Sequence, residues 1–268
     1  MKEQCAIILP QFSDIDLALC RATLYSALAL GFRPPTEENV CRIVEPENTA
    51  ALTDAGAFLD ADARSALVDA IESVALAGRV GAAALAPGYR SLFGHTARST
   101  VPPYETEYGN EALFQQPQEL SDLMGFYRAF GLTVKLAEHE RVDHISCECE
   151  FMSFLAMKEA YALTHDDASM LAETVKAEKL FLRDHLGRFL PTFAAQLRRE
   201  NGSGFYAELA DLTLRFLAQE TNRLGVRLGA VNLPLRPADD DRVPMACGSD
   251  TECAAMPGVC EPEGADSV

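Results

Sequence analysis

Basic side chains are scarce in this chain of 268 residues: 23 lysines and arginines stand against 40 aspartates and glutamates. The formal net charge at pH 7 is therefore −17. Because binding to a phosphate backbone requires a basic surface, this charge argues against a nucleic-acid-binding protein. An acidic surface favours cationic partners instead, such as a basic peptide.

Long apolar runs are also missing. The N-terminal apolar run ends after five residues at Pro10, which is too short for the apolar region of a signal peptide. The nearest approach to a membrane span, residues 66–88, is interrupted by Asp69, Glu72 and Arg79, whereas a span requires about 18 or more apolar residues. We therefore expect a cytoplasmic protein whose eight cysteines are mostly reduced.

Strand patterns are absent as well, since no run of β-branched residues alternates with polar ones between turn residues. Apolar residues instead recur at helical spacing along most of the chain. The sequence predicts one all-helical domain over residues 1–233, a helical bundle with a long connecting loop. The expected helices cover about 14–31, 49–59, 62–78, a shorter segment ending near 93, 117–131, 144–164, 167–200 (with a bend or restart at Pro191) and 204–225.

Two stretches lack helical periodicity. Residues 94–110 are rich in turn residues, and connections of this length inside a compact domain are usually functional or disordered. The sequence after residue 233 contains several prolines and glycines and an excess of acids. We expect residues 234–268 to be an irregular, flexible acidic tail.

Sequence motifs of enzymes are missing from the chain. It contains no G-x-S-x-G, no Walker A loop and no G-x-G-x-x-G. None of its five histidines follows a glutamate at a distance of three residues, which excludes the Glu-x-x-His pairs of di-iron bundles. No motif therefore points to an enzyme or to a bound cofactor, and we expect neither.

Two groups of cysteines are candidate metal sites. His144, Cys147 and Cys149 form the pattern H-x2-C-x-C, but helix residues two positions apart point to different faces. We interpret both cysteines of this pattern as packing residues. The second group consists of the tail cysteines Cys247, Cys253 and Cys260. Their spacing matches no zinc or iron–sulfur pattern closely. A metal- or redox-handling protein that uses these cysteines stays open.

The segment from Arg141 to His144 carries charge at the start of a predicted helix. Asp143 is a good N-cap residue for this helix, a role that contributes about 1 kcal/mol. This role leaves Arg141 and His144 unexplained, so a helical hydrolase or small-molecule binder centred on Asp143 and His144 stays open. His185 lies on an apolar stripe, and we expect it to be a core histidine with a hydrogen-bond partner.

Four segments of the sequence share a pattern in a fixed order: YRSLFGHTARSTVPPYETEY (89–108), GFYRAFGL (125–132), ERVDHISCECEFMSFLAMKEA (140–160) and LFLRDHLGRFLPTF (180–193). Together they resemble the TorD/DmsD/NarJ family of chaperones for molybdenum enzymes. The resemblance is closest to the delta-type chaperones that serve nitrate, selenate and chlorate reductases and ethylbenzene and dimethylsulfide dehydrogenases.

The chain departs from the family pattern at four positions. Gly88 stands where an acidic residue is frequent, and Val142 replaces a proline. Cys149 replaces a leucine, and Phe189 stands where the family often has tryptophan, a residue this chain lacks. We expect Cys149 and Phe189 to preserve apolar burial.

The resemblance implies an all-helical cytoplasmic chaperone. It would hold the catalytic subunit of a molybdopterin enzyme, often at its twin-arginine signal peptide, until the cofactor is inserted. A receptor for arginines followed by an apolar stretch requires carboxylates beside an apolar groove. The resemblance thus implies a client site with carboxylates from Glu105, Glu107, Asp143 and Glu148, and a groove formed by Leu92, Phe93, Pro103, Tyr104 and Phe126, together with Tyr89 and Tyr127.

Within this site the segment of Arg141, Asp143 and His144 is expected to be a partner-binding lip. It would lie at a helix N-terminus and face the Pro-Pro-Tyr-Glu loop. His144 would be a hydrogen-bonding or pH-sensitive contact, not a catalytic base.

Overall fold

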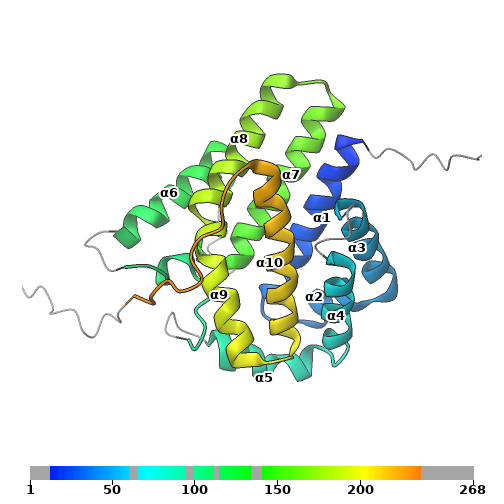
Figure 1. Ribbon diagram of the computed structural model, residues 1–268, viewed down its shortest axis with the longest axis vertical. Coiled ribbons are helices and arrows are strands. Elements are labelled where there is room, and N and C mark those ends of the chain that lie inside the picture. The colour runs from blue at the N-terminus through cyan, green and yellow to red at the C-terminus, as the bar shows by residue number, and fades with distance from the viewer. Residues whose placement is uncertain (1–12, 61–65, 95–98, 111–114, 134–140, 237–268) are drawn as a thin grey trace, which may run out of the picture. The chain divides into compact units, whose positions relative to one another are not determined.

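The computed structural model describes residues 13–60, 66–94, 99–110, 115–133 and 141–236. Within these ranges the chain is helical, and two isolated β-bridges are its only extended pairings, which confirms the predicted all-α class. The tail cysteines lie outside the described residues. The elements (Figure 1) are α1 (Asp14–Phe32), α2 (Glu37–Val44), α3 (Pro46–Leu59), α4 (Leu67–Gly78), α5 (Ala82–Phe93), the 3-10 turn η1 (Glu105–Glu107), α6 (Gln115–Ala129), α7 (Ile145–Thr164), α8 (Ala168–Asp184), α9 (Leu186–Asn201) and α10 (Phe205–Leu224).

Helix α1 is the central helix of the fold. Its first turn is closed by a capping box, in which Ser13 Oγ accepts from the Asp16 amide at 3.2 Å and the Ser13 amide donates to the Asp16 carboxylate at 3.1 Å. The helix packs along α7, where Arg21 forms a buried ion pair with Glu159. Tyr25 at its centre is fully buried.

The apolar composition of α1 follows from this central position. In the described part of the chain it is the one helix long and apolar enough, by length and composition, to cross a membrane. By length and composition α1 thus resembles a membrane span more than residues 66–88 do, so the expectation that residues 66–88 come nearest to a span was wrong. The core helix of a globular fold has the same composition, because most of its faces contact other helices.

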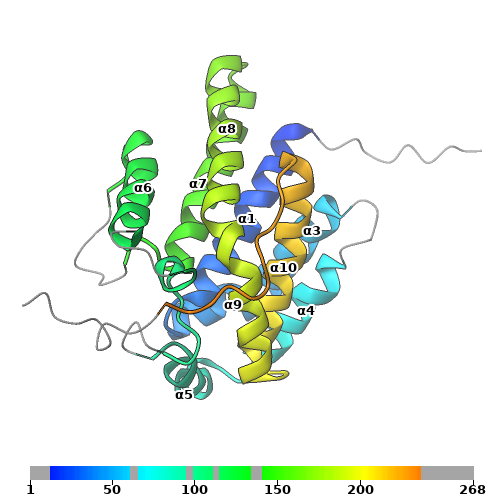
Figure 2. The ribbon, with the colours of Figure 1, turned by 60° about the vertical axis from the view of Figure 1, so that its left-hand side comes forward.

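Helices α7 and α8 run side by side, with α6 to their left in Figure 2. Aromatic side chains pack between these helices. Phe181 of α8 stacks edge-on against Phe151 of α7 at 4.7 Å between ring centroids, and Phe126 of α6 contacts the ring of Phe181 at 5.4 Å. Cys149 and Phe189 are both fully buried. The expectation that they preserve apolar burial is confirmed.

The break in the long predicted helix 167–200 lies at His185 and not at Pro191, so this expectation was wrong. His185 has non-helical backbone angles (φ −120°, ψ −100°) and separates α8 from α9. Pro191 sits inside α9, where its missing N–H leaves the Gly187 carbonyl without its helical donor. That carbonyl accepts from the Gly229 amide at 2.9 Å, so the helix continues through the proline.

Candidate partner-binding site

The Pro-Pro-Tyr-Glu loop is held on both sides by short extended pairings. Tyr104 forms an antiparallel bridge with His144, the residue before α7, and Tyr108 forms one with Leu235. On the first side the Glu105 amide donates to the Asp143 carbonyl at 2.9 Å. On the second side the Arg236 amide donates to the Glu107 carbonyl at 2.9 Å, so the chain after α10 forms part of the loop's support.

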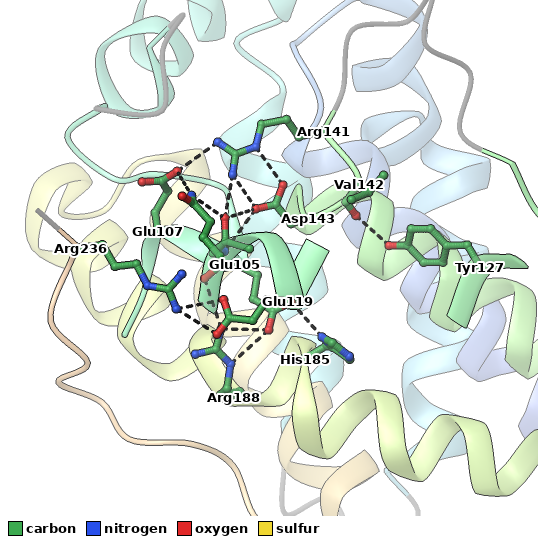
Figure 3. Close-up of polar contacts among 12 residues, drawn as sticks. Glu105, Glu107, Glu119, Tyr127, Arg141, Val142, Asp143, His185, Arg188 and Arg236 are labelled. Atoms are coloured by element: carbon green, nitrogen blue, oxygen red, sulfur yellow. Dashed lines mark hydrogen bonds and ion pairs between the residues drawn. The ribbon is translucent and has the colours of Figure 1, made fainter. Parts of the chain in front are cut away.

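The carboxylate of Asp143 joins this loop to the segment before α7 (Figure 3). It accepts from the Thr106 hydroxyl at 2.8 Å and the Thr106 amide at 3.2 Å. The guanidinium of Arg141 binds it through two nitrogens, at 3.0 and 2.8 Å, and reaches Glu107 at 3.0 Å. Asp143 is therefore not the N-cap of α7 as predicted, because its carboxylate is occupied by a loop 37 residues earlier in the chain.

The N-cap of α7 is His144. Its Nδ1 accepts from the Ser146 amide at 3.1 Å, which places the proton on Nε2. Burial, together with the positive charges of Arg141 and Arg33, lowers the pKa of His144 from its ordinary 6.5 to about 3. The imidazole is therefore neutral at physiological pH, which contradicts the expected pH-sensitive contact.

Glu105 is fully buried and lies on the opposite side of the loop. One of its carboxylate oxygens accepts from Arg188 Nε and Nη2 at 3.1 and 2.9 Å, and the other lies 3.1 Å from His185 Nδ1. His185 is 3% exposed, so the expected core histidine with a hydrogen-bond partner is confirmed. Two arginines of this cluster, Arg188 and Arg236, and their partner Glu119 were missed because no local pattern marks them.

Glu148, on the first turn of α7, is also fully buried. Burial raises its pKa well above the ordinary 4.5, and the nearby charges of Glu105 and Asp143 raise it further. Both effects favour the protonated form of Glu148. The expectation that Glu105, Asp143 and Glu148 offer carboxylates to a partner is corrected by their complete burial; Glu107, with a side chain 17% exposed, retains some access.

A pocket of about 340 Å³ opens where the lip meets the loop and α5. Four of the expected groove residues line it, namely Tyr89, Phe93, Pro103 and Tyr104, and they are joined by His144 of the lip. The sequence did not predict the other lining residues, among them Pro34 and Pro35. The full lining is Pro34, Pro35, Ala86, Tyr89, Arg90, Phe93, Gly94, Pro103, Tyr104 and His144.

The remaining groove candidates do not line this pocket. Leu92 is 4% exposed and belongs to the core. Phe126 packs against Phe181 and His185 between the helices. Tyr127 is buried, and its hydroxyl donates to the Val142 carbonyl at 2.9 Å, so it supports the lip from behind.

The chain is similar to proteins of one family. Residues 58–195 match the family described as nitrate reductase delta subunit, a span that includes the loop, the lip and Arg188. The chain is 28% identical over 212 residues to the perchlorate reductase assembly chaperone protein of Dechloromonas aromatica (strain RCB), covering 76% of this chain and 89% of that protein.

Chaperone proteins TorD are similar over a shorter stretch. The protein of Vibrio cholerae serotype O1 is 28% identical over 142 residues, which are 52% of this chain and 62% of that protein. The protein of Photobacterium profundum is 26% identical over 132 residues, or 49% and 60%. The matches thus span less than two thirds of these TorD proteins.

Proposed function

Because the chain belongs to the nitrate reductase delta subunit family, which confirms the resemblance carried by its four segments, we propose that it is a molybdoenzyme chaperone. It binds the catalytic subunit of a respiratory molybdopterin enzyme in the cytoplasm, before the cofactor is inserted, and performs no catalysis itself. Its similarity to a perchlorate reductase assembly chaperone and to TorD chaperones supports this role.

The observation that carries the proposal is the pocket beside the lip. Its walls are aromatic rings and prolines, which contact an extended polypeptide well. Behind it, Asp143 of the lip pairs with its neighbour Arg141 and accepts from Thr106 of the loop. Glu105 of the loop pairs with Arg188 of α9. These interactions hold the loop and the lip in one geometry, and the half-buried Tyr89 and Tyr104 contact the client.

The client segment is either a twin-arginine signal peptide or part of the mature subunit. The net charge of −17 supports attraction of a basic segment, because an acidic surface raises the encounter rate with cations. The arginines of such a signal would pair with acids outside the pocket, and the partly exposed Glu107 of the loop is one candidate.

The test is co-purification of the tagged chain with its client from cells that express the molybdoenzyme. Ala86 lines the pocket, so Ala86→Trp fills it, whereas Ala84→Trp places the same side chain at an exposed position of α5 that does not line it. We expect the wild type and Ala84→Trp to retain a stoichiometric catalytic subunit and Ala86→Trp to lose most of it. Recovery of no such subunit with the wild type would overturn the proposed function.

A double substitution of Asp143 and His144 by alanine is a weaker test. Both side chains are buried and hold the loop, so loss of binding in that variant would not separate a contact from a folding defect. The pocket-filling pair avoids this ambiguity, since thermal unfolding of Ala86→Trp and Ala84→Trp can be compared directly.

A further inference from the structure

No carboxylate is found among the described residues that line the pocket beside the lip. Among the described residues that line it, Arg90 is the one charged side chain, since His144 is neutral. Arg90 is exposed at the rim, and no ion-pair partner for it is found in the part of the chain that the structure describes. An arginine of the client that entered the pocket would be repelled by Arg90, because no described lining residue carries a negative charge.

Two further arginines lie near the pocket. Arg33, next to the lining residue Pro34, and Arg141 both act on His144 electrostatically. Arg141 also lies over the ring of Tyr104, with its guanidinium carbon 4.3 Å from the ring centroid. These two arginines have carboxylate partners, Glu150 and Asp143, whereas Arg90 is left as the site for an anion.

The size and walls of the pocket indicate what kind of side chain fits inside it. About 340 Å³ is at the small end of ligand sites, so the pocket holds one or two side chains and not a helix. Its walls present the rings of Tyr89, Phe93 and Tyr104, with T-shaped contacts of 4.9 Å between Tyr89 and Phe93 and 5.3 Å between Tyr104 and His144. Such walls favour a bulky apolar or aromatic side chain.

We propose that the pocket binds a client segment in which a bulky apolar side chain stands next to an aspartate or glutamate. The apolar side chain fills the space between Tyr89 and Tyr104, and the adjacent carboxylate pairs with Arg90 at the rim. This inference rests on the proposed function, because it takes the ligand to be a polypeptide. It places any arginine pair of the client outside the pocket.

The test uses three labelled twelve-residue peptides with a Gly-Ser background and a central Phe-Glu, Phe-Gln or Phe-Arg, titrated with the full chain by fluorescence anisotropy. We expect Phe-Glu to bind about fivefold more tightly than Phe-Gln, the factor that one exposed ion pair supplies, and Phe-Arg to bind most weakly. The preference should shrink in high salt, because exposed charges are screened.

Two matched variants locate the effect. Arg90→Glu should reverse the order of the three peptides, whereas Arg79→Glu, the same charge change at an exposed arginine that does not line the pocket, should preserve it. Equal affinities for the three peptides, tightest binding of Phe-Arg, no binding of any peptide, or an unchanged order in Arg90→Glu would each overturn the inference.

Failure of this inference can be separated from failure of the proposed function. If the wild type co-purifies with a molybdoenzyme subunit but the peptides show no preference for Phe-Glu, only the inference about the pocket is wrong. If the wild type captures no such subunit, the chaperone function itself is wrong.

Discussion

Arg188 of α9 binds a single carboxylate oxygen of Glu105 through two nitrogens, at 2.9 and 3.1 Å, across 83 residues of sequence. Glu105 is fully buried, whereas the Arg188 side chain is 25% exposed. The pair fixes the loop of the candidate site to the helix behind it. The role of Glu105 is therefore structural, because both of its carboxylate oxygens are occupied by Arg188 and His185 and cannot bind a client.

Arg188→Met should therefore destabilise the chain strongly. Removing one partner of a buried pair leaves an uncompensated charge, at a cost of about 3 kcal/mol. Arg183→Met is the matched control, since Arg183 is more than half exposed and pairs with its neighbour Asp184. Urea unfolding should show a much lower midpoint for Arg188→Met and an unchanged one for Arg183→Met; similar midpoints would mean that the buried pair contributes little.

Tyr127→Phe tests the support of the lip from behind. The substitution removes the hydrogen bond from the Tyr127 hydroxyl to the Val142 carbonyl and leaves that carbonyl without this donor. We expect a loss of about 1 kcal/mol in the free energy of unfolding, together with weaker client binding. Tyr161→Phe, at a tyrosine 54% exposed, should change neither quantity. Unaltered binding in Tyr127→Phe would show that the lip keeps its geometry without this bond.

The helices could be predicted because their apolar spacing and caps are local. Helix α2 was missed, since its eight residues bury only Val40 and Ile43, too few to form a recognisable stripe. The role of Asp143 could not be predicted either, because Thr106 competes for its carboxylate from another part of the chain. The same reason applies to Glu105 and Glu148: the resemblance implied carboxylates open to a client, and only tertiary contacts bury them.

The glycines of α6 and α9 should respond in opposite ways to alanine. A Cβ at Gly187 would lie 2.3 Å from the Leu182 carbonyl oxygen, and backbone cannot easily move there. A Cβ at Gly125, in the exposed middle of α6, would meet nothing within 4 Å. We expect Gly187→Ala to destabilise by about 2 kcal/mol or more and Gly125→Ala to stabilise by about 0.5 kcal/mol. Thermal unfolding distinguishes the two; a stable Gly187→Ala would mean that the α8–α9 junction can shift.

Glu148 should make the fold less stable as pH rises. Its pKa is raised in the folded state by burial and by Glu105 and Asp143, so above its ordinary pKa of 4.5 the unfolded chain holds fewer protons than the folded one. Stability then falls with increasing pH. Glu148→Gln, which has no charge to lose, should be more stable than the wild type at pH 8, and the difference should diminish towards pH 4.5. A constant difference between these pH values would argue against a protonated Glu148.

His144 should have the opposite dependence. Its folded pKa is about 3, below the ordinary 6.5, so the unfolded chain gains a proton first as pH falls. The wild type should lose up to about 1.4 kcal/mol of stability per pH unit below pH 6.5 through this group alone. His144→Asn keeps an acceptor for the Ser146 amide, since asparagine is a good N-cap, but cannot titrate. In urea unfolding from pH 7 to 4.5 the stability of this variant should fall less steeply than that of the wild type. Equal slopes would mean that His144 takes up its proton in the folded chain as readily as in the unfolded one. That outcome would restore the pH-sensitive contact in the lip that the buried, neutral imidazole now argues against.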